Sequence, residues 1–209
     1  MTTLYLIRHA RSEGNAMQVI QGWLDLPLDE YGRRQARLLG ERFRHKSLAA
    51  IYSSTLLRAA DTARAIADTL GMPVIPDARL REYHMGAWTG LTAAEIDQMM
   101  PPHYFENAVE PIGPGAESGQ EMRDRVSTFL DDMLARHNGD RVAVVSHGGT
   151  LGGFASAILS LPPVRHQPFH FGNASVTKFV FEHGRWRMSG LNDRCHLRSL
   201  MAGGAAGSH

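Results

Sequence analysis

The sequence predicts an α/β fold, a three-layer α/β/α sandwich in which a mostly parallel sheet has helices on both faces. Short apolar segments typical of buried strands alternate with longer segments whose apolar residues recur every three to four positions. Of the 209 residues, 43% are hydrophobic and 21% are charged, which is the composition of an ordinary globular protein. We expect one domain over residues 1–201 and a disordered tail of small residues at 202–209.

Two strand-and-helix units open the chain. Residues 3–7 are almost all apolar, as in a buried strand, and a polar loop leads from them into a helix. Residues 31–44 place Ala36, Leu39 and Phe43 at helical spacing between arginines, so they predict an amphipathic helix.

Residues 49–52 predict the second buried strand. The helix after it, at 56–70, carries alanines and leucines at helical spacing, and Gly71 suits its C-cap. A short strand is expected at 73–75.

The middle of the chain is less regular. Residues 91–99 predict a short helix that the prolines at 101 and 102 must end. We interpret the turn-rich and Pro/Gly-rich stretch at about 83–120 as an excursion that forms a lid. A helix at 118–136 then begins with Ser118 and Glu121 in the pattern of a capping box.

The last elements repeat the plan of the first. Residues 141–146 form a Val-rich strand, 147–149 a tight turn and 150–159 a helix. The strands at 175–182 and 185–191, joined by a His-Gly pair, predict a hairpin.

Composition excludes several classes of function. A formal net charge of +1 gives no broad basic surface, so neither nucleic acid nor an anionic membrane is an expected partner. The single cysteine, Cys195, cannot form an intramolecular disulfide, and the N-terminus lacks the pattern of a signal peptide. We therefore expect a cytoplasmic protein without membrane insertion. A homodimer is one alternative that the sequence leaves open.

Two histidines follow predicted parallel strands, where ligands bind in open α/β sheets. His9 ends the first strand and His147 ends the Val-rich strand. Arg8 and Arg58 would add two guanidinium groups, and the helices after each loop would add backbone N–H groups. This combination of cations and donors indicates a site for a phosphoryl group, although a lone histidine or arginine at such a place is more often structural.

Four segments of the chain resemble the histidine phosphatase superfamily, also called phosphoglycerate-mutase-like. They span most of the chain in the family's order. The segments are 6–15 (Leu-Ile-Arg-His-Ala-Arg-Ser-Glu-Gly-Asn, extended by Gln21-Gly22, Pro27-Leu28 and Gly32), 53–63 (around Arg58), 80–90 (around Glu82) and 146–149 (Ser-His-Gly-Gly).

The resemblance implies a role for each matching residue. His9 would attack phosphorus and form a phosphohistidine, while Arg8, Arg58 and His147 hold the phosphoryl oxygens. No metal and no other cofactor would be needed. The full set of expected substrate-binding residues is Arg8, Ser12, Asn15, Gln21, Gly22, Arg58, His147 and Gly148.

A leaving alkoxide needs a proton, so a carboxylic acid should stand near His9. The resemblance assigns this acid/base to Glu82. Glu13 and Asp61 are rivals from the sequence alone, and Asp61 lies one helical turn from Arg58, with which it could pair.

One position departs from the family's pattern. The family usually has Gly after the Arg-His pair, and this chain has Ala10. If the backbone there needs a positive φ, alanine would cost about 1 kcal/mol or more.

The lid region distinguishes a phosphatase from a mutase. No Lys or Arg occurs between Glu82 and Met122, whereas the resemblance implies that mutases carry a longer insertion with cations here. We therefore expect hydrolysis of small phosphomonoesters with neutral, apolar or sugar-like leaving groups. A substrate carboxylate would need Arg11 or Arg194.

The side chains of this region suit such leaving groups in charge and shape. Its acidic residues are Glu95, Asp97, Glu106, Glu110, Glu117 and Glu121, and the aromatic candidates for contact with the leaving group are Trp23, Tyr83, His84, Tyr104 and Phe105.

Two alternatives stay open. A cofactor-dependent phosphoglycerate mutase would share the same pocket residues, and a non-catalytic phosphate-binding or scaffold protein would share the fold. Within the superfamily, the first part of the chain and the ending at 191–197 are most similar to broad-specificity and glucosyl-3-phosphoglycerate phosphatases.

Overall fold

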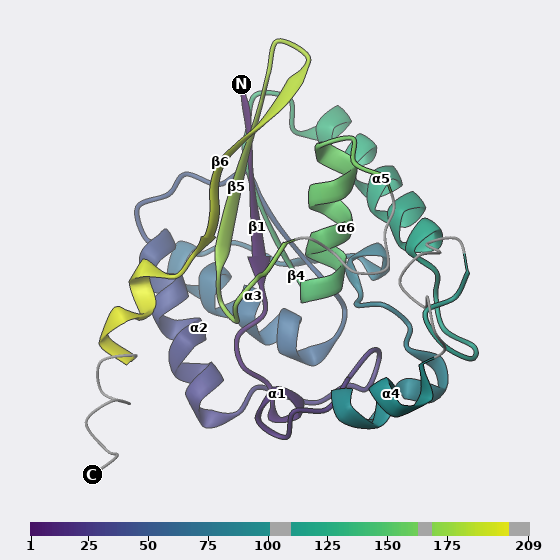
Figure 1. The fold of residues 1–209 in the computed structure, drawn as a ribbon. Helices are drawn as coiled ribbons and strands as arrows, with labels where there is room; N and C mark the ends of the chain where they lie inside the picture. The colour runs from purple at the N-terminus through teal and green to yellow at the C-terminus, as the bar shows by residue number, and fades with distance from the viewer. Residues whose placement is uncertain (101–109, 163–168, 201–209) are drawn as a thin grey trace.

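The computed structural model describes residues 1–100, 110–162 and 169–200, and a six-stranded sheet lies at its centre (Figure 1). The strand order is β3-β2-β4-β1-β5-β6. Strands β3, β2, β4 and β1 are parallel, and β5 and β6 extend the sheet in antiparallel fashion. The strands are β1 (Thr2–Arg8), β2 (Ala50–Ser53), β3 (Ile75–Pro76), β4 (Arg141–Ser146), β5 (Val176–Glu182) and β6 (Arg185–Asp193).

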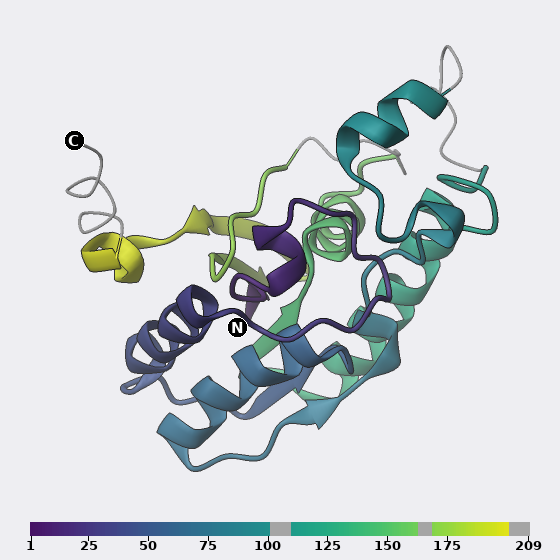
Figure 2. The ribbon, with the colours of Figure 1, turned by 90° about the horizontal axis from the view of Figure 1, so that it is seen from below.

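Helices cover both faces of the sheet. Figure 2 shows α2 (Glu30–Phe43) and α3 (Leu57–Leu70) on one side, and α5 (Gly119–Arg136) and α6 (Gly148–Ile158) on the other. The shorter α1 (Glu13–Ala16) and α4 (Ala93–Met99) lie at the end of the molecule toward which the β1 arrow points (Figure 1). The predicted α/β/α sandwich with a mostly parallel sheet is therefore confirmed. Three 3₁₀ turns complete the described elements: η1 (Ala78–Leu80), η2 (Gly86–Trp88) and η4 (Cys195–Leu197).

The central strands are buried on both faces. In β1, Leu4 and Leu6 pack with α5 and α6, whereas Ile7 packs with α2 and α3. Strand β4 divides its valines and alanine between the two faces in the same way. The continuous apolar runs of these strands predicted this position, since parallel strands have helices on both sides.

The structure confirms the predicted C-cap, capping box and hairpin turn. Gly71 ends α3 in the left-handed region with φ 65°, and Ser118 and Glu121 form both halves of the capping box of α5. His183 and Gly184, with φ of 50° and 74°, join β5 to β6, because a tight hairpin turn requires positive φ.

Two expectations were wrong in detail. There is no separate turn at 147–149: His147 is the N-cap of α6 and Gly148 its first helical residue. Gly148 and Gly149 have low helix propensity, so the sequence does not indicate a helix start there. Hydrogen bonds to Glu82 stabilise this start in the folded chain. The short strand lies at Ile75–Pro76, while Val74 packs against the cluster under α3.

The excursion at 83–120 is described only in part. Its described portions contain η2, α4 and an antiparallel bridge between Pro111 and Ser118. Residues 101–109, with Tyr104 and Phe105, and the tail at 201–209 lie outside the described residues, so lid and tail stay predictions. Of the helices described, none is sufficiently long and apolar to cross a membrane.

Candidate active site

Two adjacent parallel strands bring His9 and His147 together. Strands β1 and β4 pair in register, with Arg8 opposite Ser146, and the His9 N–H donates to the Ser146 carbonyl at 2.9 Å. The two imidazole rings therefore lie next to each other, with centroids 5.1 Å apart and planes inclined by 55°.

The hydrogen bond of His9 determines its tautomer. The ring nitrogen Nδ1 lies 2.7 Å from the Ala10 carbonyl oxygen, which can only accept, so Nδ1 carries the proton. Burial and the nearby Arg8 and Arg58 hold the pKa of His9 well below its ordinary value. The ring is neutral at pH 7, and Nε2 has a free lone pair.

His147 is fully buried beside His9. Its Nε2 lies 2.8 Å from the Ser54 hydroxyl, and its Nδ1 has no hydrogen-bond partner within the described chain. Burial first, and then the charge of Arg58, lowers the pKa of His147 well below the ordinary value. This ring too is neutral at pH 7.

Arg8 and Arg58 are held by backbone carbonyls. Arg8 donates from Nη1 to the Phe171 carbonyl, and Arg58 donates to the carbonyls of Gly22 at 2.8 Å and Leu24 at 2.9 Å. Desolvation lowers the pKa of both guanidinium groups. Neither is within ion-pair distance of a carboxylate in the described residues, and each has an unpartnered buried Nε. Arg58 is buried and Arg8 is partly buried at the cavity wall, and two cations without a direct ion pair favour binding of an anion.

Glu82 caps helix α6. Its Oε1 accepts from the N–H groups of Tyr83 and Thr150, each at 3.0 Å, and its Oε2 accepts from the Gly149 N–H at 3.0 Å. A Cβ on residue 149 would lie 2.7 Å from Glu82 Oε1, so only glycine permits this approach. The N–H groups of Gly149 and Thr150 therefore bind Glu82 and are not free for a phosphoryl group, whereas the expected role of Gly148 stays a prediction.

Further contacts fix the Glu82 main chain. Its carbonyl accepts from Trp23 Nε1 at 2.7 Å and from Arg125 Nη2 at 3.2 Å. Arg125 also donates to the Arg79 carbonyl and forms a largely buried ion pair with Glu117. Sequence reasoning missed Arg125, which lies in the middle of α5 with no local signal of a role.

Asn15 and Gln21 line the cavity that opens beside His9, and the buried Ser12 contacts both of them. The Ser12 hydroxyl is 2.8 Å from Gln21 Oε1 and 3.0 Å from Asn15 Oδ1, and Asn173 Nδ2 donates to the same Asn15 oxygen at 3.0 Å. Asn15 therefore keeps its NH₂ group for a ligand. Ser12 is 0% exposed and does not line the cavity, so it supports Asn15 rather than reaching a substrate. Asn173 was not singled out from the sequence.

The rival carboxylates are directed elsewhere. Glu13 is exposed in the first turn of α1, and Asp61 pairs with Arg64 rather than with Arg58. Ala10 is fully buried without a positive φ, and its N–H donates to the Thr62 hydroxyl at 3.0 Å. The backbone strain considered for alanine at this position is absent.

A cavity of about 580 Å³ opens over these residues. Its wall is largely apolar, and Arg8, Glu82 and Asp97 are the charged residues among the described lining. From the expected site, Arg8, His9, Asn15, Gln21, Gly22, Glu82 and Gly148 line it, and Arg58 and His147 are buried behind them. The apolar wall consists of Val19, Ile20, Met85, Trp88, Ala93, Ile96, Met100, Ile112 and Phe169, together with Tyr83.

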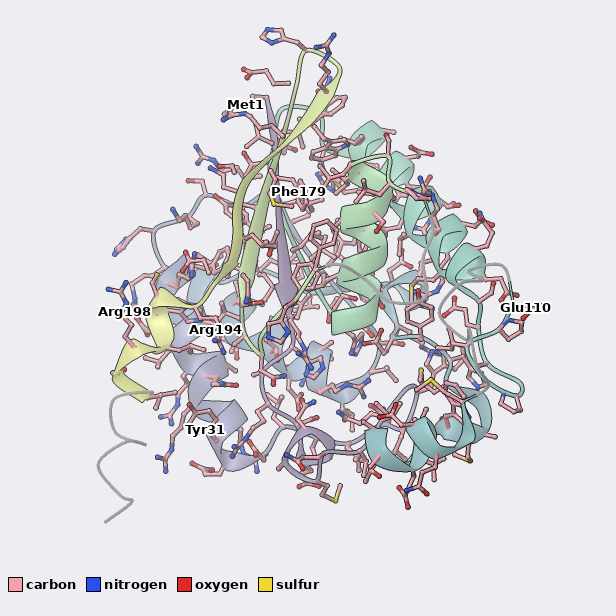
Figure 3. The ribbon with its side chains drawn as sticks, in the orientation of Figure 1. Met1, Tyr31, Glu110, Phe179, Arg194 and Arg198 are labelled. Atoms are coloured by element: carbon pink, nitrogen blue, oxygen red, sulfur yellow. The ribbon has the colours of Figure 1, made fainter. Side chains whose placement is uncertain are left out.

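Arg11 and Arg194 do not reach this cavity. Arg11 pairs with Asp29 at 2.6 Å and stacks on Tyr31, which lies at the start of α2 (Figure 3). Arg194 is exposed after β6 and packs on Gly172. The described residues also contain no group of three His, Cys, Asp or Glu side chains able to hold a metal ion.

Two adjacent imidazoles, two guanidinium groups and a carboxylate thus stand together at the carboxyl edge of the sheet in an α/β protein. The profile of the histidine phosphatase superfamily (branch 1) matches residues 4–194. The chain belongs to this superfamily.

Its relatives carry the names of phosphatases and of a mutase. A putative phosphoserine phosphatase 2 of Hydrogenobacter thermophilus is 36% identical over 205 residues, covering 96% of this chain and 100% of the relative. The probable phosphoglycerate mutase GpmB of Yersinia pestis is 35% identical over 208 residues, covering 94% and 95%. Among solved structures, a mycobacterial glucosyl-3-phosphoglycerate phosphatase is 32% identical with a TM-score of 0.83, covering 92% of this chain and 99% of that one. Bacillus stearothermophilus YhfR is 34% identical with a TM-score of 0.84, covering 95% and 100%.

Proposed function

We propose that this protein is a metal-independent phosphomonoester hydrolase that acts through a phosphohistidine on His9. The observation that carries the proposal is the hydrogen bond from His9 Nδ1 to the Ala10 carbonyl, 2.7 Å long, which leaves the Nε2 lone pair free beside His147. A neutral imidazole in this state is a nucleophile at pH 7.

In the first step, the Nε2 lone pair attacks phosphorus, and the bond from phosphorus to the ester oxygen breaks. Glu82 gives the leaving oxygen its proton, so the alcohol departs neutral. Glu82 Oε2, which accepts a single N–H bond from Gly149, is the oxygen we assign to this proton. Arg8, Arg58 and His147 would stabilise the charge on the three remaining phosphoryl oxygens.

In the second step, water attacks the phosphohistidine. Glu82, now a carboxylate, takes one proton from this water, and the bond between phosphorus and Nε2 breaks. Inorganic phosphate leaves, while His9 returns to its neutral form and Glu82 to its protonated form. The balanced reaction consumes one ester and one water for each alcohol and phosphate released.

The cavity wall supports hydrolysis of esters with an uncharged or apolar alcohol. Beyond the phosphoryl site, the described lining offers apolar side chains and Asp97, with no further cation. A phosphoglycerate carboxylate, or the second phosphate of a mutase intermediate, would be desolvated there without compensation. For this reason we favour a phosphatase over a phosphoglycerate mutase.

The test measures phosphate release from p-nitrophenyl phosphate with EDTA present. We expect turnover by the wild type, loss of at least about 10³-fold in His9→Ala, and no change in His45→Ala, which removes an exposed histidine. A wild type and a His9→Ala variant with equal rates would exclude the mechanism. Inactivity of both would support a non-catalytic binding protein.

A second assay addresses the mutase alternative. The protein is given 3-phosphoglycerate, and both free phosphate and the 2-phospho isomer are measured. Isomerisation without phosphate release would overturn the argument from the cavity wall. A panel that compares benzyl phosphate with 3-phosphoglycerate should show a higher kcat/KM for the apolar ester.

A further inference from the structure

Ser54 stands in a row with the two histidines. Strand β2 pairs with β4 on the side opposite to β1, and the Ser54 N–H donates to the Val145 carbonyl at 3.0 Å. The strand order β2-β4-β1 therefore places Ser54, His147 and His9 side by side at the carboxyl edge. Ser54 is 0% exposed, and its Oγ lies 2.8 Å from His147 Nε2.

The hydroxyl of Ser54 has one proton to give. A serine hydroxyl offers one donor and two lone pairs. The Leu56 N–H donates to this oxygen at 3.2 Å and occupies one lone pair. His147 Nε2 is the remaining partner in the described chain. If Nε2 carried a proton, it would take the second lone pair and leave the buried hydroxyl proton without an acceptor, at a cost in stability.

We propose that Ser54 is a positioning residue that donates to His147 Nε2 and so keeps the single ring proton of His147 on Nδ1. This nitrogen, which is buried and lacks a partner in the described residues, then presents an N–H to a phosphoryl oxygen. The consequence for the phosphoryl group rests on the proposed function, whereas the tautomer itself does not.

The two rings then offer opposite hydrogen-bonding groups to a bound phosphoryl group. His9 gives its Nδ1 proton to the Ala10 carbonyl and presents a lone pair, while His147 accepts from Ser54 and presents a donor. With the opposite tautomer, His147 would present a lone pair to a phosphoryl oxygen, and the two would repel each other. Ser54 would thus decide which histidine donates.

The direct test is the tautomer of His147 in the wild-type protein. Long-range ¹H–¹⁵N spectra of protein labelled in histidine distinguish protonated from unprotonated ring nitrogens, and the His147→Gln variant assigns the signals. We expect Nδ1 protonated and Nε2 unprotonated, both with and without inorganic phosphate. A proton on Nε2 would overturn the proposal, even if activity still depended on His9.

The functional test compares Ser54→Ala with Ser53→Ala. Ser53 is equally buried, but its hydroxyl donates to the Ser54 carbonyl at 2.9 Å and does not contact His147. In Ser54→Ala, we expect kcat/KM to fall and the inhibition constant of inorganic phosphate to rise by about tenfold each, the worth of one buried hydrogen bond. Ser53→Ala should change both by less than about threefold.

Equal losses in the two serine variants would mean that Ser54 acts by packing alone, against the proposal. A Ser54→Ala protein that keeps the wild-type Nδ1 tautomer would overturn it as well. If Ser54→Ala does not fold, the wild-type spectrum still decides. Wild-type inactivity toward every phosphomonoester would refute the proposed function but leave the tautomer measurable.

Discussion

The ring of His9 lies 5.1 Å from that of His147, and both are buried next to Arg8 and Arg58. Burial and the two arginines keep both imidazoles uncharged. An uncharged nucleophile and an uncharged donor can share a pocket with two cations, whereas two imidazolium ions could not. The same two histidines therefore affect both the chemistry of the site and the stability of the fold, because each is harder to protonate in the folded protein than in the unfolded chain.

The first prediction concerns stability against pH. The pKa values of His9 and His147 are lowered in the folded state, so below about pH 6.5 the unfolded chain binds more protons than the folded chain. The free energy of unfolding must therefore fall as the pH decreases below 6.5, by up to about 1.4 kcal/mol per pH unit for each histidine. Urea unfolding between pH 7.5 and 5 measures this slope.

The variant His147→Gln isolates one of these contributions. His196, whose pKa burial lowers to about 4, adds a slope of the same sign, so the difference between variant and wild type is the quantity to compare. We expect a shallower slope in His147→Gln and an unchanged slope in His45→Ala. Parallel curves for wild type and His147→Gln would show that His147 is protonated as readily in the folded protein as in the unfolded chain.

The second prediction concerns Glu82→Gln. The amide oxygen can take the place of Oε1 and accept from Tyr83 and Thr150, whereas an NH₂ group in the place of Oε2 loses the bond from Gly149. We expect the fold to be retained at a small cost in stability, but the amide has no acidic proton to give. The value of kcat/KM should fall about 10²- to 10⁴-fold for an alkyl phosphate, whose alkoxide needs protonation. It should fall much less for p-nitrophenyl phosphate, whose phenolate leaves unassisted. Equal losses for the two substrates would remove Glu82 from the role of acid.

The third prediction concerns Arg58→Lys. Arg58 spans the carbonyls of Gly22 and Leu24 with two nitrogens, and a lysine has one nitrogen for both carbonyls and the phosphoryl group. We expect kcat/KM to fall about 10²- to 10³-fold, with a weaker affinity for vanadate. Arg64→Lys, on the exposed side of the same helix, is the control. A rate within about threefold of the wild type would mean that charge alone suffices at this position.

The sequence predicts the central fold well because its signals are local and agree with one another. The apolar runs of β1 and β4, the capping box at Ser118 and the C-cap at Gly71 each act within a few residues. The convergence of His9 and His147 also follows from position, since both end parallel strands. Their adjacency depends on the strand order, which the alternation of strands and helices does not determine.

Contacts between distant segments could not be predicted in this way. Glu82 caps α6 from 67 or more residues away, and this cap starts the helix at Gly148, where helix propensity is low. Arg125 is an arginine on an amphipathic helix, and such a residue is usually solvated. Its ion pair with Glu117 and its hydrogen bond to the Glu82 carbonyl depend on the folded arrangement of distant segments, which the local sequence does not predict.

The fourth prediction addresses this ion pair. The side chains of Arg125 and Glu117 are 18% and 12% exposed, so removal of one partner leaves a largely buried charge. Glu117→Gln should destabilise the fold by about 2–4 kcal/mol and Arg125→Met by a similar amount. The double variant should be less destabilised than the sum, because the second substitution removes the unpaired charge. Additive losses in thermal or urea unfolding would show that the two residues act independently.

The last prediction concerns Ala10→Gly, which restores the residue that the superfamily usually has after the Arg-His pair. Ala10 has no positive φ, its methyl group is fully buried, and it packs in a cluster with Leu28, Ala36 and Leu197. Glycine would gain nothing from its conformational freedom in the folded state, and it would lose this packing and raise the entropy of the unfolded chain. We expect the variant to be about 1 kcal/mol less stable in urea unfolding. The value of kcat/KM should stay within about threefold of the wild type, because the carbonyl that holds His9 Nδ1 remains. A glycine variant that is both more stable and faster would show that the alanine strains this loop.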